Sequence, residues 1–206
     1  MSILVLASGG GSNFQALLDD ADLRPHLRGL ICNRPGAGCL ERARASGLAS
    51  QVLDHQGFES RQAFDEALAQ AILDINPDWI VMAGFMRILG EPFMREFDGK
   101  MVNIHPSLLP KYKGLNTHQR ALDAGDTHAG VSVHWATAEL DGGPLIAQRS
   151  VAIEPSDDAS TLAARVLQQE HQVYPAVCRA LTQGRLQMKN GTTWLDGQPM
   201  DHWDRF

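Results

Sequence analysis

The chain has 206 residues, and its 18 Lys and Arg against 24 Asp and Glu give a formal net charge of −6. This length suits one α/β domain, which buries roughly 70% of its unfolded surface without needing disulfides. The acidic balance disfavours nucleic acid and anionic membranes as partners. Three cysteines without a Cys-x-x-Cys pair indicate neither a disulfide framework nor a thiolate metal site. The early apolar run Ile3 to Ala7 is too short for a signal core or a membrane span. We therefore expect a cytoplasmic protein whose ligands are small molecules.

The first half of the chain alternates apolar runs with polar helical stretches. The apolar runs are typical of strands covered on both faces, and they occupy residues 3–7, 27–33, 51–53 and 79–83. Helical spacing begins at Phe14, and further helices are expected over residues 41–46, ending at Gly47, and 60–73. This order predicts a parallel sheet with right-handed crossovers.

The second half predicts a different sheet geometry. A strand over residues 101–105 leads into a loop rich in Pro and Lys, and a short helix is expected over 116–124. Alternation, partial over 131–137 and clearer over 145–153, predicts two strands in a mixed or antiparallel extension of the sheet. The chain closes with a long helix over 160–182 and a hairpin turning at Asn190-Gly191.

No linker separates the halves, so we expect a single domain over residues 1–206. The predicted fold is α/β: a Rossmann-like, open, mostly parallel twisted sheet with helices on both faces. A mixed or antiparallel extension is expected at its C-terminal side.

The glycine-rich turn Ser8 to Asn13 lies between the first strand and the first helix. Glycines allow a sharp turn and close approach of the backbone, and a helix start offers free N–H groups to a phosphate. The Ser8 and Ser12 hydroxyls and the Asn13 amide would add donors. No Gly-Lys-Ser/Thr follows, and Phe14 stands where a dinucleotide fingerprint needs its third glycine. A tight turn without a ligand is the alternative.

Asn103 and His105 project to the same side of their strand, which Pro106 then ends. An amide donor and a titratable ring at a strand end suit an oxyanion and a proton transfer. Asp141 precedes two glycines and a proline, and a carboxylate near His105 would orient or charge the imidazole. The alternatives are a polar strand end and an ordinary turn aspartate.

Other polar residues have simpler interpretations. Ser132 and His134 alternate on one strand and so face the same layer. Residues 86–89 follow another strand and would either line a pocket for a flat anionic ligand or pack a helix start. Glu170, on the long helix, is by default a solvated residue, and the histidines show no metal-ligand spacing.

Five motifs in order make the chain resemble the folate-dependent formyltransferases. They are Ser-Gly-Gly-Gly-Ser-Asn at 8–13, Gly-Phe-Met-Arg-Ile-Leu at 84–89, Asn-x-His-Pro-Ser-Leu-Leu-Pro at 103–110, Gly-x-Ser-Val-His at 130–134 and Leu-Asp-Gly-Gly at 140–143. The first turn is similar to that of the members that use a ribose phosphate. The resemblance implies transfer of formyl from 10-formyltetrahydrofolate, as co-substrate, to the amine of glycinamide ribonucleotide in purine biosynthesis.

The resemblance also implies a role for each matching residue. The catalytic set would be Asn103, His105 and Asp141, supported by Ser132 and His134. The ribonucleotide would contact Gly11, Ser12, Asn13 and Glu170. The folate would be held by Arg61, Met86, Arg87, Ile88, Leu89, Asn103, Thr137, Ala138, Glu139, Leu140 and Asp141. Asn116 departs from relatives that carry histidine there, which leaves substrate contact in that loop open.

The mechanism implied is direct attack of the amine on the formyl carbon. Asn103 and protonated His105 would stabilise the oxyanion, and Asp141 would keep His105 charged and relay a proton. No metal is needed, and the protein would be a monomer or homodimer.

Two rival functions stay open. A formyltetrahydrofolate hydrolase would use the same three residues but has no need of the phosphate turn. A non-catalytic sensor of a phosphate ligand would not require the intact triad.

Overall fold

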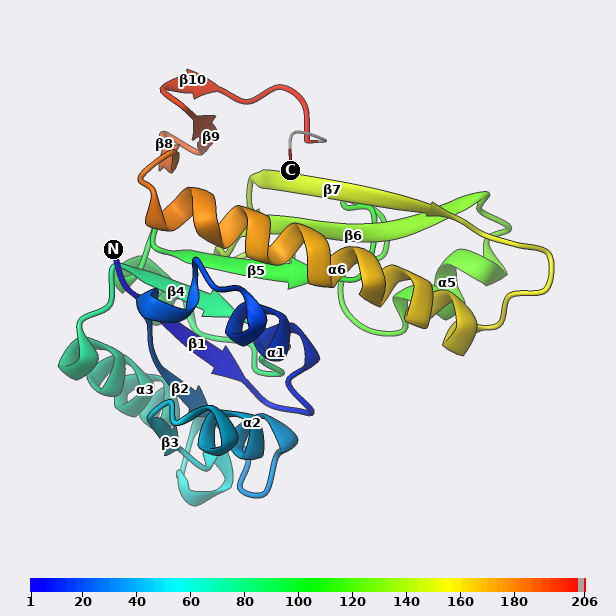
Figure 1. Ribbon diagram of the computed structural model, residues 1–206. Helices are drawn as coiled ribbons and strands as arrows, with labels where there is room; N and C mark the ends of the chain where they lie inside the picture. Colours follow the sequence, from blue (N-terminus) through cyan, green and yellow to red (C-terminus); the bar gives the residue numbers. More distant parts are fainter. Residues whose placement is uncertain (204–205) are drawn as a thin grey trace.

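The computed structural model describes residues 1–203 and 206, and its main sheet runs through both halves of the chain (Figure 1). This seven-stranded sheet has the order β3-β2-β1-β4-β5-β6-β7. Its strands are β1 (Ile3–Ala7), β2 (Leu27–Cys32), β3 (Ser50–Val52), β4 (Trp79–Met82), β5 (Met101–His105), β6 (His128–Trp135) and β7 (Leu145–Ala152). A small sheet in the order β10-β9-β8 contains β8 (Leu186–Lys189), β9 (Thr192–Leu195) and β10 (Gln198–Pro199).

Six α-helices lie within the described residues. They are α1 (Ser12–Asp19), α2 (Gly38–Ser46), α3 (Arg61–Ile75), α4 (Glu91–Glu96), α5 (Thr117–Asp123) and α6 (Ala159–Thr182). Short 3-10 turns, η1 (Arg24–His26) and η2 (His55–Gly57), precede β2 and α3. None of the helices in this part of the chain is long and apolar enough to cross a membrane.

The strand pairing confirms the predicted fold class. β1 to β5 are parallel, whereas β5 with β6 and β6 with β7 are antiparallel. The antiparallel closing hairpin is also confirmed, as β8 and β9. α4 and the two-residue β10 were not predicted, because each is too short to show a periodic pattern.

Each side of the sheet has its own apolar core. Along β1, Ile3 and Val5 point toward α1, α2 and α6, whereas Leu4 and Leu6 point toward α3 and α4. The covering helices on both faces make three layers, and Figure 1 shows α6 crossing the sheet beside β5 and β6. All five residues of β1 are buried, as a strand covered on both sides requires.

Local chemistry sets the helix ends. Ser60 caps α3 by accepting a hydrogen bond from the Ala63 N–H at 3.1 Å. The left-handed Gly47 ends α2 as predicted. α3 continues to Ile75, beyond the predicted end. Asp158 caps α6 in a capping box with Thr161.

α6 is fixed to the centre of the sheet by a buried tyrosine. The Tyr174 hydroxyl donates to the Met82 carbonyl oxygen at 2.7 Å and lies 3.3 Å from the Val102 carbonyl oxygen. These carbonyls belong to β4 and β5, so the bond sets the position of α6 relative to the strands that carry the candidate site.

We expect Tyr174→Phe to lower the free energy of unfolding by about 1 kcal/mol, because a buried hydrogen bond is lost while the ring stays. Urea unfolding of the variant and the unchanged protein measures this. Equal midpoints would show that the hydroxyl does not hold α6 to the sheet.

Candidate active site

The candidate site lies where β1, β4 and β5 reach one edge of the sheet. The connections of β1 and β4 run in opposite directions across the sheet order, so a crevice opens between their carboxyl ends. Three segments border this crevice: the glycine turn after β1, residues 84–89 after β4, and the end of β5. The sheet therefore gathers motifs that lie far apart in the sequence.

Asn103, His105 and Asp141 are brought together at the end of β5. The Asp141 Oδ2 atom lies 3.4 Å from His105 Nδ1, and its Oδ1 atom lies 3.5 Å from Asn103 Nδ2. Asp141 has a left-handed φ of 47°, and its side chain is only 7% exposed. The Gly114 N–H donates to Asp141 Oδ2 at 2.9 Å, so two loops meet on one carboxylate.

His105 is buried, and a backbone carbonyl determines its orientation. Its Nε2 atom lies 2.9 Å from the Tyr112 carbonyl oxygen, which can only accept, so Nε2 carries the proton and Nδ1 faces Asp141. Burial lowers the pKa of His105, although the Tyr112 carbonyl and the Asp141 carboxylate favour the charged ring. The buried imidazole therefore loses its proton more readily than an exposed histidine, whereas the mechanism expected from the sequence has a protonated His105.

Asp141 keeps its charge in this buried position. Burial alone would raise the pKa of Asp141, but His134, the Gly114 N–H and His105 outweigh burial, and the pKa lies below its ordinary value. His134 Nε2 lies 3.2 Å from Asn103 Nδ2 and 3.6 Å from Asp141 Oδ1. The cluster thus combines a charged carboxylate, an amide donor and two imidazoles.

Ser132 and His134 pair directly with the catalytic candidates across the sheet. Ser132 is opposite His105, and His134 is opposite Asn103. The buried Ser132 hydroxyl donates to the Ser107 carbonyl at 2.7 Å and accepts from the Leu109 N–H at 3.0 Å. It therefore fixes the loop that follows His105.

The glycine turn after β1 is shaped by α2. Gly11 has φ 74°, and a Cβ atom there would approach the Cys39 Cβ to 2.7 Å. Gly11 is the N-cap of α1, and no side chain caps this helix start. The first N–H groups of α1 are thus available to an anion.

Glu170 and Asn13 are in contact at this helix start. The Asn13 side-chain amide donates to Glu170 Oε2 at 2.6 Å. Glu170 is 7% exposed, so the default interpretation of a solvated residue is wrong. Burial raises the pKa of Glu170 despite the hydrogen bond from Asn13. A carboxylate is therefore held beside the candidate phosphate position.

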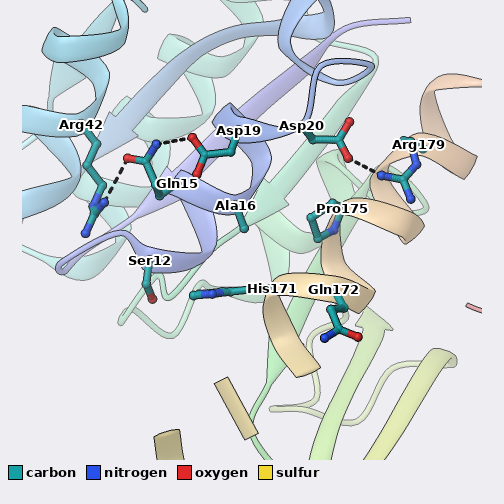
Figure 2. Close-up of a pocket in the computed structure, with 10 residues that line it drawn as sticks. All are labelled: Ser12, Gln15, Ala16, Asp19, Asp20, Arg42, His171, Gln172, Pro175 and Arg179. Atoms are coloured by element: carbon teal, nitrogen blue, oxygen red, sulfur yellow. Dashed lines mark hydrogen bonds and ion pairs between the residues drawn. The ribbon is translucent and has the colours of Figure 1, made fainter. Parts of the chain in front are cut away.

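A pocket of about 680 Å³ extends from Ser12 along the groove between α1 and α6 (Figure 2). Figure 2 shows its charged groups paired within the wall: Arg42 with Gln15, and Asp20 with Arg179. His171 borders the pocket, and its buried Nε2 atom has no hydrogen-bond partner among the described residues.

The Ser8 hydroxyl is not available to a ligand in this turn. Ser8 is 2% exposed, and its hydroxyl donates to Asn33 Oδ1. The expectation that Ser8 adds a donor for phosphate is therefore wrong, because the hydroxyl points away from the turn into the protein.

A narrow slot beside Asn103 gathers most of the residues expected to hold a folate. Its lining is Met82, Arg87, Ile88, Leu89, Met94, Asn103, His134, Ala136, Thr137, Ala138, Glu139, Leu140 and Asp141. The slot encloses about 60 Å³, well below the 300 Å³ or more that is typical of a small-molecule pocket.

Two of the folate candidates lie outside this slot. Met86 is 60% exposed and is absent from the lining. Arg61 borders a separate groove of about 570 Å³ between α3 and α4. Asp65 lines the same groove, and the charges of Arg61 and Arg87 both act on its carboxyl.

Sequence reasoning missed the backbone partners of the site. Gly114 and Tyr112 contribute through their N–H and C=O groups, which no side-chain motif reveals. Asn116 is exposed at the left-handed start of α5 and has no side-chain capping bond. Among residues 1–203 and 206, no three His, Cys, Asp or Glu side chains are arranged to hold a metal ion.

Comparison with known proteins identifies the family. A family model described as "Formyl transferase" matches residues 1–178. The phosphoribosylglycinamide formyltransferase of Escherichia coli strain K12 is 46% identical over 201 residues, which cover 96% of this chain and 95% of that protein. The chain belongs to the phosphoribosylglycinamide formyltransferase family.

Two further relatives agree with this assignment. The Haemophilus influenzae phosphoribosylglycinamide formyltransferase is 40% identical over 96% of this chain and 95% of its own length. A solved structure of the Coxiella burnetii phosphoribosylglycinamide formyltransferase, in complex with CHES, superposes with a TM-score of 0.92. It shares 45% sequence identity and covers 97% of this chain and 95% of that one. Both relatives are phosphoribosylglycinamide formyltransferases, which supports the enzyme class, and the superposition supports the α/β fold.

We expect Gly11→Ala to lower the free energy of unfolding by roughly 1–3 kcal/mol, since it forces an alanine into left-handed backbone and against Cys39. Gly9→Ala is the matched control, because a Cβ atom there meets nothing within 4 Å and the φ of Gly9 lies outside the left-handed range. Thermal unfolding of both variants measures the difference. Equal losses would contradict a special requirement for glycine at position 11.

Burial should also make stability depend on pH through three histidines. It lowers the pKa values of His105, His118 and His171 below 6.5, so acidification protonates them in the unfolded chain first. Their stabilising contribution is complete above pH 6.5 and is lost as the pH falls toward the folded pKa values.

Urea unfolding between pH 7.5 and pH 5.5, values of about one unit either side of the ordinary pKa of histidine, tests this. We expect stability to fall toward pH 5.5, and to fall less steeply in His118→Gln. Stability that rises on acidification would show that the folded protein takes up protons more readily than the unfolded chain, as the raised pKa of Glu170 favours, and would contradict a dominant effect of the histidines.

Proposed function

We propose that this chain transfers the formyl group of 10-formyltetrahydrofolate to the amine of glycinamide ribonucleotide, giving the N-formyl product and tetrahydrofolate. The observation that carries the proposal is the contact of Asn103, His105 and Asp141, of which Asn103 and Asp141 line the slot together with most of the folate candidates. The relatives are named for formyl transfer to phosphoribosylglycinamide, which supports the same reaction here.

The slot suits an anionic, partly flat co-substrate. Arg87 lies with its guanidinium carbon 5.5 Å from the centre of the Phe64 ring, and its buried Nε atom has no partner among the described residues. Ile88 and Leu140 are exposed large apolar side chains at the slot. Arg87 would hold a carboxylate, and Arg61 would meet an acidic tail that continues past Asp65.

The ribonucleotide phosphate would bind at the start of α1. Backbone N–H groups of Gly11, Ser12 and Asn13 supply donors without any basic side chain. Glu170, held by Asn13, would accept a hydrogen bond from the ribose or amide portion of the substrate. An acidic protein can bind an anion in this way, because the helix start supplies the local field.

The triad can assist both bond formation and bond cleavage. The amine nitrogen attacks the formyl carbon, and Asn103 Nδ2 donates to the oxygen that becomes negative. Negative charge beside His105 raises its affinity for a proton, which offsets the effect of burial. Protonation of this imidazole is then coupled to formation of the oxyanion.

Asp141 provides the path for the proton. Its carboxylate is charged, lies between Asn103 and His105, and can take the proton released by the attacking amine, directly or through water. As the bond from the formyl carbon to the folate nitrogen breaks, that nitrogen receives the proton. Atoms and charges balance without a metal or a covalent enzyme intermediate.

An assay with 10-formyltetrahydrofolate and glycinamide ribonucleotide tests the function directly. Folate absorbance should change only when both substrates are present. Turnover without the ribonucleotide would indicate the hydrolase, and no turnover with either acceptor would favour the sensor.

Substitution of the triad tests the mechanism. We expect Asn103→Ala, His105→Ala and Asp141→Ala each to lower kcat by about 10²–10³-fold, the usual cost of losing an oxyanion donor or proton relay. His128→Ala, at an exposed position on β6, is the control and should keep full activity. Triad variants within about threefold of the unchanged kcat would contradict the assigned roles.

A further inference from the structure

Ser8 has a set of contacts that neither the phosphate turn nor the triad explains. Its N–H donates to the Gly84 carbonyl at 3.1 Å, and its hydroxyl oxygen accepts from the Met86 N–H at 2.7 Å. The same hydroxyl donates to Asn33 Oδ1. Ser8 and Asn33 are 2% and 1% exposed. One buried side chain thus joins segments that follow β1, β2 and β4.

Asn33 accepts the proton of the Ser8 hydroxyl. A hydroxyl has a single proton, and giving it to Asn33 leaves the oxygen lone pairs for the Met86 N–H. Asn33 is held in turn by His55, whose Nδ1 atom lies 2.8 Å from the Asn33 carbonyl oxygen and 3.3 Å from its Nδ2 atom. The Met86 N–H can only donate, so Ser8 accepts from Met86 and donates to Asn33, whose position His55 helps to fix.

This bond lies at the crevice between β1 and β4. The segments after these two strands diverge, so strand pairing no longer holds them together beyond the sheet. The hydrogen bonds of Ser8 connect the end of β1 to Gly84 and Met86, which follow β4. The next three residues, 87–89, line the slot beside Asn103.

The glycine turn has separate supports. The Cys39 N–H donates to the Gly9 carbonyl at 3.0 Å, and Arg42 Nε donates to the Gly10 carbonyl at 2.7 Å. Both donors come from α2. Loss of the Ser8 hydroxyl would consequently loosen the 84–89 segment while the turn keeps its shape.

We propose that Ser8 is a positioning residue for folate binding, whose buried hydroxyl fixes the 84–89 segment to the end of β1 and so sets the wall of the slot. This role rests on the proposed function, because it concerns affinity for the folate. Under this proposal the affinity for the folate depends on the Ser8 side chain, whereas the affinity for the ribonucleotide does not.

The test compares Ser8→Ala with Ser2→Ala. Ser2 is the matched control, because it lies at the opposite end of the same strand and its hydroxyl also bonds a group before β4, Asp78 Oδ2, at 2.9 Å. The dissociation constants of tetrahydrofolate and glycinamide ribonucleotide are measured by calorimetry, and KM and kcat by the transfer assay. Hydrogen exchange of the Met86 amide reports the bond itself.

In Ser8→Ala we expect the Kd of tetrahydrofolate and the KM of the formyl donor to rise about tenfold, as for one lost buried hydrogen bond. We expect kcat within about threefold and the Kd of the ribonucleotide within about twofold of the unchanged values. The Met86 amide should exchange faster. Ser2→Ala should lose stability while its ligand affinities stay the same.

If Ser8→Ala does not fold, Asn33→Ala provides a second test of the same hydrogen bonds. This variant leaves the Ser8 oxygen in place but frees its proton, so a smaller rise in the folate Kd and faster exchange at Met86 are expected. Unchanged folate affinity in either folded variant, or equal losses for both substrates, overturns the role of Ser8. Wild-type protein that neither binds tetrahydrofolate nor transfers formyl overturns the proposed function and this role with it.

Discussion

The candidate site depends on keeping the Asp141 carboxylate charged within the protein. An ionised group removed from water costs several kcal/mol unless hydrogen bonds and opposite charges replace the lost solvent. Here the replacements come from separate segments: the Gly114 N–H, the Asn103 amide and the imidazoles of His105 and His134. The loops around residues 114 and 141 must therefore both be folded before the triad has its geometry.

The fold was largely predictable because its signals are local and repeated. The strands predicted over 3–7 and 101–105 correspond residue for residue to β1 and β5, and Gly47 ends α2 as expected. The change to antiparallel pairing also followed from alternation along β6 and β7. The short α4 escaped notice because six residues are too few to show a helical period.

The candidate site was predictable in identity but not in detail. Asn103 and His105 share a strand face, so spacing alone placed them together, whereas the approach of Asp141 needed the resemblance to known formyltransferases. The burial of Glu170 depends on packing between α1 and α6, which no local pattern encodes. For the same reason the Ser8 hydroxyl was misassigned: its partners lie 25 and 78 residues away.

The contact between Gly11 and Cys39 has a consequence for the chemistry of the thiols. Cys39 lies under the glycine turn with its Sγ atom 3.5 Å from that of Cys32, and both thiols are free and buried. Burial raises the pKa of Cys39 to about 12, so little thiolate forms at neutral pH. An alkylating reagent can then modify Cys39 only when the protein around this buried thiol opens. The rate of Cys39 labelling would therefore report how often the protein opens around the glycine turn.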